Sequence, residues 1–149
     1  MEMRILRPDS AKIFCQLIEK MQGKQLLKIE NEPFMALTIE KTAQDLALTG
    51  YGNSDVYSLA HYYTQNGDLM SDPEMTFIVI TKAEGVADLD SVIILPRSFQ
   101  QSDMGIYEES IIFHLPKGLE FSRNMQAQHT EFAEVWLNNI KDQKFLERL

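Results

Sequence analysis

The segment VYSLAHYYTQNGDLMSDPEMTFIVIT, residues 56–81, decides the fold. Its two ends, 56–64 and 75–81, are rich in aromatic and β-branched residues, which favour extended strands. Between them, Asn66-Gly67-Asp68 favours a tight reversal because Asn and Gly tolerate left-handed backbone angles. The pattern therefore predicts a β-hairpin whose connecting loop runs from Tyr63 to Glu74.

Helical periodicity marks both ends of the chain. Residues 9–22 place apolar side chains at helical spacing behind Asp9 or Ser10 as N-cap, and Gly23 follows as a left-handed stop. Residues 124–146 carry a second apolar stripe. The residues that we expect to be buried against the sheet are Phe14, Leu17, Ile18, Phe132, Trp136 and Ile140.

Further short strands are predicted on both sides of the hairpin, at 24–31, 34–40, 46–50, 91–95 and 106–114, with a polar loop at 82–90. Successive strands with short connections pair as an antiparallel meander, and helices must cover one face because a lone sheet cannot bury both. We therefore predict a single α+β domain spanning 1–149. It comprises an antiparallel five- or six-stranded meander sheet with an N-terminal and a C-terminal helix packed on one face.

The acidic composition limits the partners. The net charge is −8, and residues 42–81 contain no Lys or Arg. Nucleic-acid affinity comes chiefly from Lys and Arg, so direct nucleic-acid binding is not expected. A cation or a basic partner suits this segment better, although a net negative charge also simply keeps a protein dispersed.

The chain shows no feature of a secreted or membrane protein. A chain of 149 residues can bury a core without disulfides, and Cys15, the single cysteine, is read as a structural thiol in a reduced compartment. No secretory signal and no apolar run long enough to span a membrane is present. These observations predict a cytoplasmic protein.

Polar and ionisable side chains are concentrated in one segment, 61–75. On a strand of period two, His61 shares a face with Tyr57 and Leu59, whereas Tyr62 shares the other face with Ser58 and Ala60. The loop at 103–107 is expected to adjoin this hairpin. The candidate binding residues are His61, Tyr62, Asn66, Gly67, Asp68, Asp72, Glu74, Asp103 and Tyr107.

Three carboxylates in this segment raise the possibility of a divalent cation. Asp68, Asp72 and Glu74 could hold Mg²⁺ or Mn²⁺, with His61 as a further ligand or as the base that activates water. Their spacing matches neither an EF-hand nor a zinc site. Alternatively, Asn66-Gly67-Asp68 serves only the turn, and no residue is assigned a catalytic role.

The stretch HYYTQNGDLMSDPEMTF at 61–77 resembles the signature of a family of uncharacterised bacterial domains of plasmids, phages and conjugative elements. The runs at 33–40, 96–109 and 132–145 agree with that family, although Gln101-Ser102-Asp103 replaces an expected Asn-Asp pair. The resemblance implies an accessory protein of a bacterial mobile element. The resemblance does not imply a particular activity.

Three functional hypotheses follow. The first is a non-enzymatic binding module whose acidic hairpin, 61–75, engages a partner protein or a small ligand. The second is a metal-assisted hydrolase or nuclease-like enzyme that uses His61, Asp68, Asp72 and Glu74. The third is an acidic anti-restriction protein, suggested by the charge of the middle segment together with the resemblance.

Overall fold

A computed structural model describes residues 3–48, 52–81, 92–114 and 118–148. The predicted loop at 82–90 and the end of the predicted strand at 46–50 lie outside these ranges. The elements are α1 (Pro8–Lys20), β1 (Leu26–Asn31), β2 (Phe34–Leu48), β3 (Gly52–Gln65), β4 (Asp68–Thr81), β5 (Val92–Gln101), a 3-10 turn at Ser102–Met104, β6 (Ile106–Glu109), β7 (Ile111–Phe113), β8 (Leu119–Phe121), α2 (Arg123–Asp142) and a second 3-10 turn at Phe145–Glu147.

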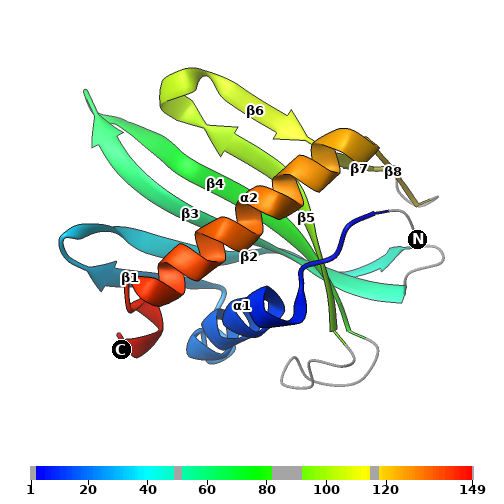
Figure 1. Ribbon diagram of the computed structural model, residues 1–149, viewed down its shortest axis with the longest axis horizontal. Helices are drawn as coiled ribbons and strands as arrows, with labels where there is room; N and C mark the ends of the chain where they lie inside the picture. Colours follow the sequence, from blue (N-terminus) through cyan, green and yellow to red (C-terminus); the bar gives the residue numbers. More distant parts are fainter. Residues whose placement is uncertain (1–2, 49–51, 82–91, 115–117, 149) are drawn as a thin grey trace.

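The sheet is a meander. Its six strands follow one another in space in the order β1 to β6, and each pairs antiparallel with the next (Figure 1). β7 and β8 form a separate two-stranded sheet. The predicted antiparallel meander of five or six strands is therefore confirmed, and it has six strands.

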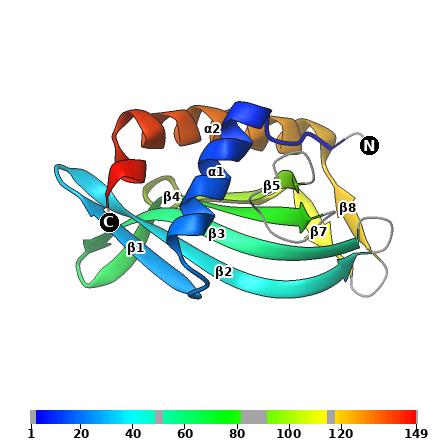
Figure 2. The ribbon, with the colours of Figure 1, turned by 90° about the horizontal axis from the view of Figure 1, so that it is seen from below.

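Both helices lie on the same face of the sheet (Figure 2), as predicted. The alternation of strand side chains explains this arrangement, because every second residue of β3 and β4 adds to one continuous apolar surface. Tyr57, Leu59 and Phe77 from these strands are buried against Phe14 of α1 and Leu137 of α2. The side chain of Phe14 lies with its ring centre 4.7 Å from that of Phe77.

Five of the six residues predicted to be buried are buried, and Phe132 is not. Phe132 is 40% exposed, because it lies on a flank of α2 that the sheet covers only in part. Its ring contacts Phe99 of β5 and Trp136 of the same helix. The apolar stripe of α2 is thus wider than the surface that the sheet covers.

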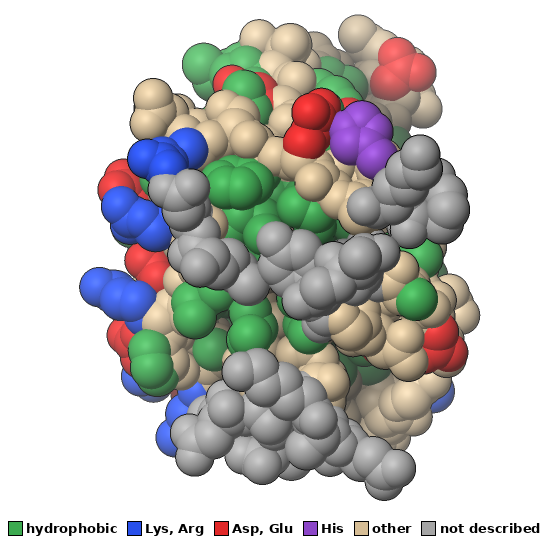
Figure 3. All heavy atoms as spheres, turned by 90° about the vertical axis from the view of Figure 1, so that its right-hand side faces the viewer, with side chains coloured by type: hydrophobic (Ala, Val, Ile, Leu, Met, Phe, Trp, Pro, Cys, Tyr) green, Lys and Arg blue, Asp and Glu red, His purple; other side chains and the backbone are tan. Residues whose placement is uncertain are grey.

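A second apolar cluster occupies the opposite face at one end of the sheet. Val56, Ile78, Ile80 and Leu95 point to this face, and Ile111 of β7 packs against them. Figure 3 views this end of the molecule, where apolar side chains gather in the middle and Lys and Arg side chains lie along one edge. The short sheet β7–β8 therefore closes a second core on the face without helices.

Several boundaries differ from the predictions. The first helix begins at Pro8, with Arg7 as N-cap, because proline is well accommodated at the first helical position. The predicted strand 106–114 is broken at Ser110, whose backbone N–H and hydroxyl both bond to the carbonyl of Arg97. This break allows β7 to leave the main sheet and pair with β8, a strand that was not predicted.

The predicted loop from Tyr63 to Glu74 was wrong. β3 continues to Gln65 and β4 begins at Asp68, so that Asn66 and Gly67 alone form the turn, with φ angles of 53° and 85°. Left-handed angles at both positions are those of a two-residue hairpin turn, for which Asn-Gly is the preferred sequence. The acidic residues beyond the turn consequently lie on a strand.

Candidate functional site

A bulge in the hairpin determines where its acidic residues point. Ala60 pairs with Glu74 and Tyr62 with Ser71, so His61 faces two residues of β4, Asp72 and Pro73. The extra residue shifts the alternation of side chains by one position. As a result Asp72 lies on the face that carries the helices, whereas Glu74 lies on the opposite face.

The helix-side group is built around His61. Its ring is buried, and the rings of Trp136 and Phe145 have their centres 5.6 and 5.7 Å from its own. Nδ1 lies 3.1 Å from the carbonyl oxygen of Ala36, to which it donates a hydrogen bond. Burial lowers the pKa of His61, so the neutral ring is favoured in the folded protein.

Asp72, whose charge acts on the ring of His61, is linked to a second carboxylate, Asp103. The side-chain amide of Gln101 donates to Asp72 and, at 2.9 Å, to Oδ1 of Asp103. The hydroxyl of Ser102 accepts a hydrogen bond of 2.8 Å from the backbone of Ser71. Gln101 and Ser102 thus connect the hairpin to the segment 103–107, which was predicted to adjoin it.

The opposite-face group is a compact hydrogen-bonded cluster around Glu74. Its carboxylate accepts hydrogen bonds from Ser58 at 2.9 Å and from Ser71 at 3.0 Å. Tyr62 also contacts this carboxylate, and burial together with the charge of Glu74 raises the pKa of Tyr62 to about 12. Exposed Tyr107 lies on the same face, opposite Gln100 of β5.

The nine candidate residues therefore fall into three places. His61, Asp72 and Asp103 lie on the helix side, and Tyr62, Glu74 and Tyr107 on the other face. Asn66, Gly67 and Asp68 form the tip, where Asp68 is exposed opposite Gln65. Asp68 and Asp72 are four positions apart along an extended strand, which corresponds to a distance of about 13 Å.

The three carboxylates named for a cation are not brought together. Asp68 is at the tip, and Asp72 and Glu74 point to opposite faces because of the bulge. Within the described ranges, no group of three or more His, Cys, Asp or Glu side chains is placed to hold a metal ion. Sequence reasoning grouped the three carboxylates because a loop from Tyr63 to Glu74 would bend back and bring them together. The extended strand β4 takes the place of that loop and spreads them apart.

A pocket of about 220 Å³ opens on the helix side, between the hairpin and α2. Phe34, Met35, Pro73 and Trp136 provide its apolar walls, and His61 lies among them. Asn139 and Gln143 of α2 complete the lining. Sequence reasoning placed Trp136 in the core and gave no role to Asn139, although the spacing 132, 136, 139, 143 marks one flank of the helix.

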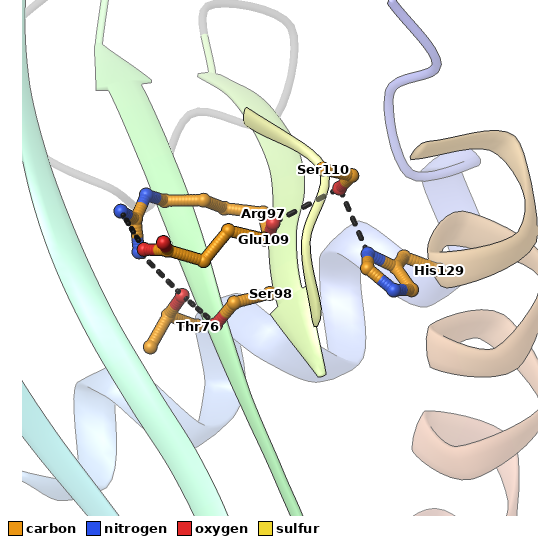
Figure 4. A network of polar contacts seen from close by, with 6 residues as sticks. All are labelled: Thr76, Arg97, Ser98, Glu109, Ser110 and His129. Atoms are coloured by element: carbon orange, nitrogen blue, oxygen red, sulfur yellow. Dashed lines mark hydrogen bonds and ion pairs between the residues drawn. The ribbon is translucent and has the colours of Figure 1, made fainter. Parts of the chain in front are cut away.

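A second polar network joins α2 to the far edge of the sheet (Figure 4). His129 Nδ1 lies 2.8 Å from the hydroxyl of Ser110, which donates to the carbonyl of Arg97. The guanidinium of Arg97 lies 2.9 Å from Glu109 and also contacts Thr76. These contacts join residues of β4, β5, β6 and α2 with Ser110, so the network holds this edge of the sheet to the helix.

These features define the class of the protein: a two-layer α+β domain, with a six-stranded antiparallel meander covered on one face by two helices. The chain belongs to the family described as domain of unknown function DUF6908, whose model matches residues 12–146. Neither a curated protein nor a solved structure matches the chain. None of the described helices is both long and apolar enough to cross a membrane.

Proposed function

We propose that this domain is a non-enzymatic binding module, which engages a partner through the helix side of the 61–75 hairpin and through the adjoining segment 103–107. The observation that carries the proposal is the pair of carboxylates, Asp72 and Asp103, held together by Gln101. No Lys or Arg among the described residues pairs with either of them. A negative charge kept beside an open pocket is suited to a basic partner.

The setting of this activity is proposed from the resemblance. The runs at 61–77, 96–109 and 132–145 resemble bacterial domains of mobile genetic elements. We therefore place the protein in a bacterial cytoplasm, as an accessory factor of such an element. Its partner is accordingly sought among proteins of the element or of the host cell.

The test compares capture with stability in one double variant, Asp72→Asn with Asp103→Asn. The wild-type chain, immobilised and exposed to an extract of cells that carry the element, should retain a partner that the variant loses. Because asparagine has the size of aspartate and keeps one oxygen that can accept from Gln101, the melting temperature should stay within about 2 °C. Retention of the same partner by the variant would refute the proposal.

A matched control removes the same amount of charge elsewhere. Asp9 and Glu120 are exposed, and within the described ranges each forms one ion pair, with Arg7 and His114 respectively. The variant Asp9→Asn with Glu120→Gln therefore changes the net charge equally without touching the hairpin. It should capture the partner as well as the wild type does, and a loss there would mean that net charge alone is responsible.

A further inference from the structure

The helix-side pocket has the size of a side chain. Sites for complete small ligands usually occupy about 300–1,000 Å³, and this pocket measures about 220 Å³. Its walls are mainly apolar, formed by Phe34, Met35, Pro73 and Trp136. An aliphatic or aromatic group fits such a space better than a charged one.

The apolar surface continues beyond the pocket along α2. Phe132 and Val135, one turn away from Trp136 and Asn139, are 40% and 63% exposed. Phe34 and Met35 are also partly exposed on the β2 side of the pocket. Apolar surface of this extent is typical of a contact with a protein segment, because a small amine would leave most of it in water.

The polar groups around the pocket complement a peptide. The indole N–H of Trp136 is buried, and no described residue accepts a hydrogen bond from it. Asn139 and Gln143 each carry a carboxamide that can both donate and accept, as a peptide main chain requires. Asp72, directly before Pro73 of the pocket wall, adds negative charge at its edge, and Asp103 reinforces it through Gln101.

We infer that the partner docks through a segment in which an aliphatic or aromatic side chain fills the pocket and a neighbouring Lys or Arg meets Asp72 and Asp103. This inference rests on the proposed function and adds the chemistry of the partner. The apolar group loses contact with water in the pocket, and the cation neutralises a carboxylate pair that has no basic partner in the described chain. An acidic segment would be repelled at the same place.

The chain contains one tryptophan, Trp136, so its indole N–H resonance and its fluorescence report on this pocket alone. Three blocked tripeptides serve as probes: acetyl-Leu-Lys-Leu-amide, acetyl-Leu-Glu-Leu-amide and acetyl-Ser-Lys-Ser-amide. The first should shift the Trp136 indole resonance and saturate at millimolar concentration, as expected for so small a ligand. The second, which has the wrong charge, and the third, which lacks the apolar groups, should not saturate in that range.

The charge of the site is tested in the same titration. The double variant Asp72→Asn with Asp103→Asn should weaken binding of the Leu-Lys-Leu probe about two- to fivefold, the range for exposed ion pairs. The variant Asp9→Asn with Glu120→Gln should leave its affinity unchanged. Both variants are compared at one ionic strength, because added salt screens the interaction.

Three outcomes would overturn the inference. One is equal binding of the three probes, and another is the absence of saturation by the Leu-Lys-Leu probe throughout the millimolar range. The third is a shift of the Trp136 resonance on dilution without any probe, which would show that a second copy of the chain fills the groove. If capture of the partner still depends on Asp72 and Asp103, the proposed function survives any of these, whereas capture that ignores both residues removes it.

Discussion

The two ends of the helix-covered face are built from the same alternation of strand residues and differ in how well they are covered. Next to α1, the rings of Phe14, Tyr57 and Phe77 are packed against one another and excluded from water. Beyond α2, where the β3–β4 hairpin extends past the helix on the side away from α1 (Figure 1), Phe132 and Val135 remain exposed.

The difference arises from helix coverage rather than from composition. α1 lies over one end of the sheet, and α2 crosses it and leaves the hairpin end open (Figures 1 and 2). The open end is also where His61, the carboxylate pair and the pocket lie. We therefore expect stability to depend mainly on the covered end, and binding on the open one.

The largest expected effect is in the covered end. Phe77→Ala should lower the free energy of unfolding by about 3–5 kcal/mol, because it leaves a cavity among fully buried neighbours. Urea unfolding followed by circular dichroism measures this loss. A change below about 1 kcal/mol would mean that α1 and the sheet are not packed as described.

A smaller effect is expected from His61, which lies in the open end and lines the pocket. Burial lowers its pKa in the folded protein, so below about pH 6.5, the ordinary pKa of histidine, the unfolded chain binds protons more readily than the folded one. The contribution of His61 to the free energy of unfolding should therefore be constant above about pH 6.5 and fall as the pH drops through the lowered pKa. Unfolding measured across this range should show a steeper loss for the wild type than for His61→Gln, and identical slopes would contradict the assignment.

The sequence predicted the covered end well and the open end poorly. Alternation in 56–64 and 75–81 correctly gave adjacent strands and placed Tyr57 and Leu59 on one face with His61, because the period of a strand is independent of distant residues. The bulge at Asp72 and Pro73 was not predicted. The bulge places Asp72 and Glu74 on opposite faces of the sheet. A shift of one residue leaves little trace in the amino-acid composition of the strand.

Contacts between distant parts of the chain were also beyond sequence reasoning. The bridge from Gln101 to Asp72 joins residues 29 positions apart. Gln101 belongs to the run Gln101-Ser102-Asp103, where the family resemblance led us to expect an Asn-Asp pair, and this difference made a role for the loop less secure. Phe132 was predicted to be buried because the helical period identifies an apolar stripe and does not show how much of it the sheet covers.

A smaller loss of stability is expected from the open end. Phe132→Ala should cost about 1 kcal/mol, since the ring is 40% exposed and its removal leaves a surface depression rather than a closed cavity. Urea unfolding under the conditions used for Phe77→Ala provides the comparison. Equal losses for the two variants would show that both ends contribute alike to the folded state.

The smallest effect on stability is expected for Asp72→Asn with Asp103→Asn. Each asparagine can still accept a hydrogen bond from the amide of Gln101, and neither carboxylate has a Lys or Arg partner among the described residues whose loss would cost energy. Removing two neighbouring negative charges from a chain of net charge −8 also relieves repulsion. The free energy of unfolding should therefore change by less than about 0.5 kcal/mol, in either direction.

The variant Gln101→Leu is the informative companion, because it removes the amide that both carboxylates share and leaves them to repel each other. It should be less stable than the wild type, and the triple variant that adds both asparagines should recover part of that loss. If the double variant instead unfolds several degrees earlier, the carboxylate pair is part of the folded framework, and its availability to a partner can no longer be argued from the absence of a base.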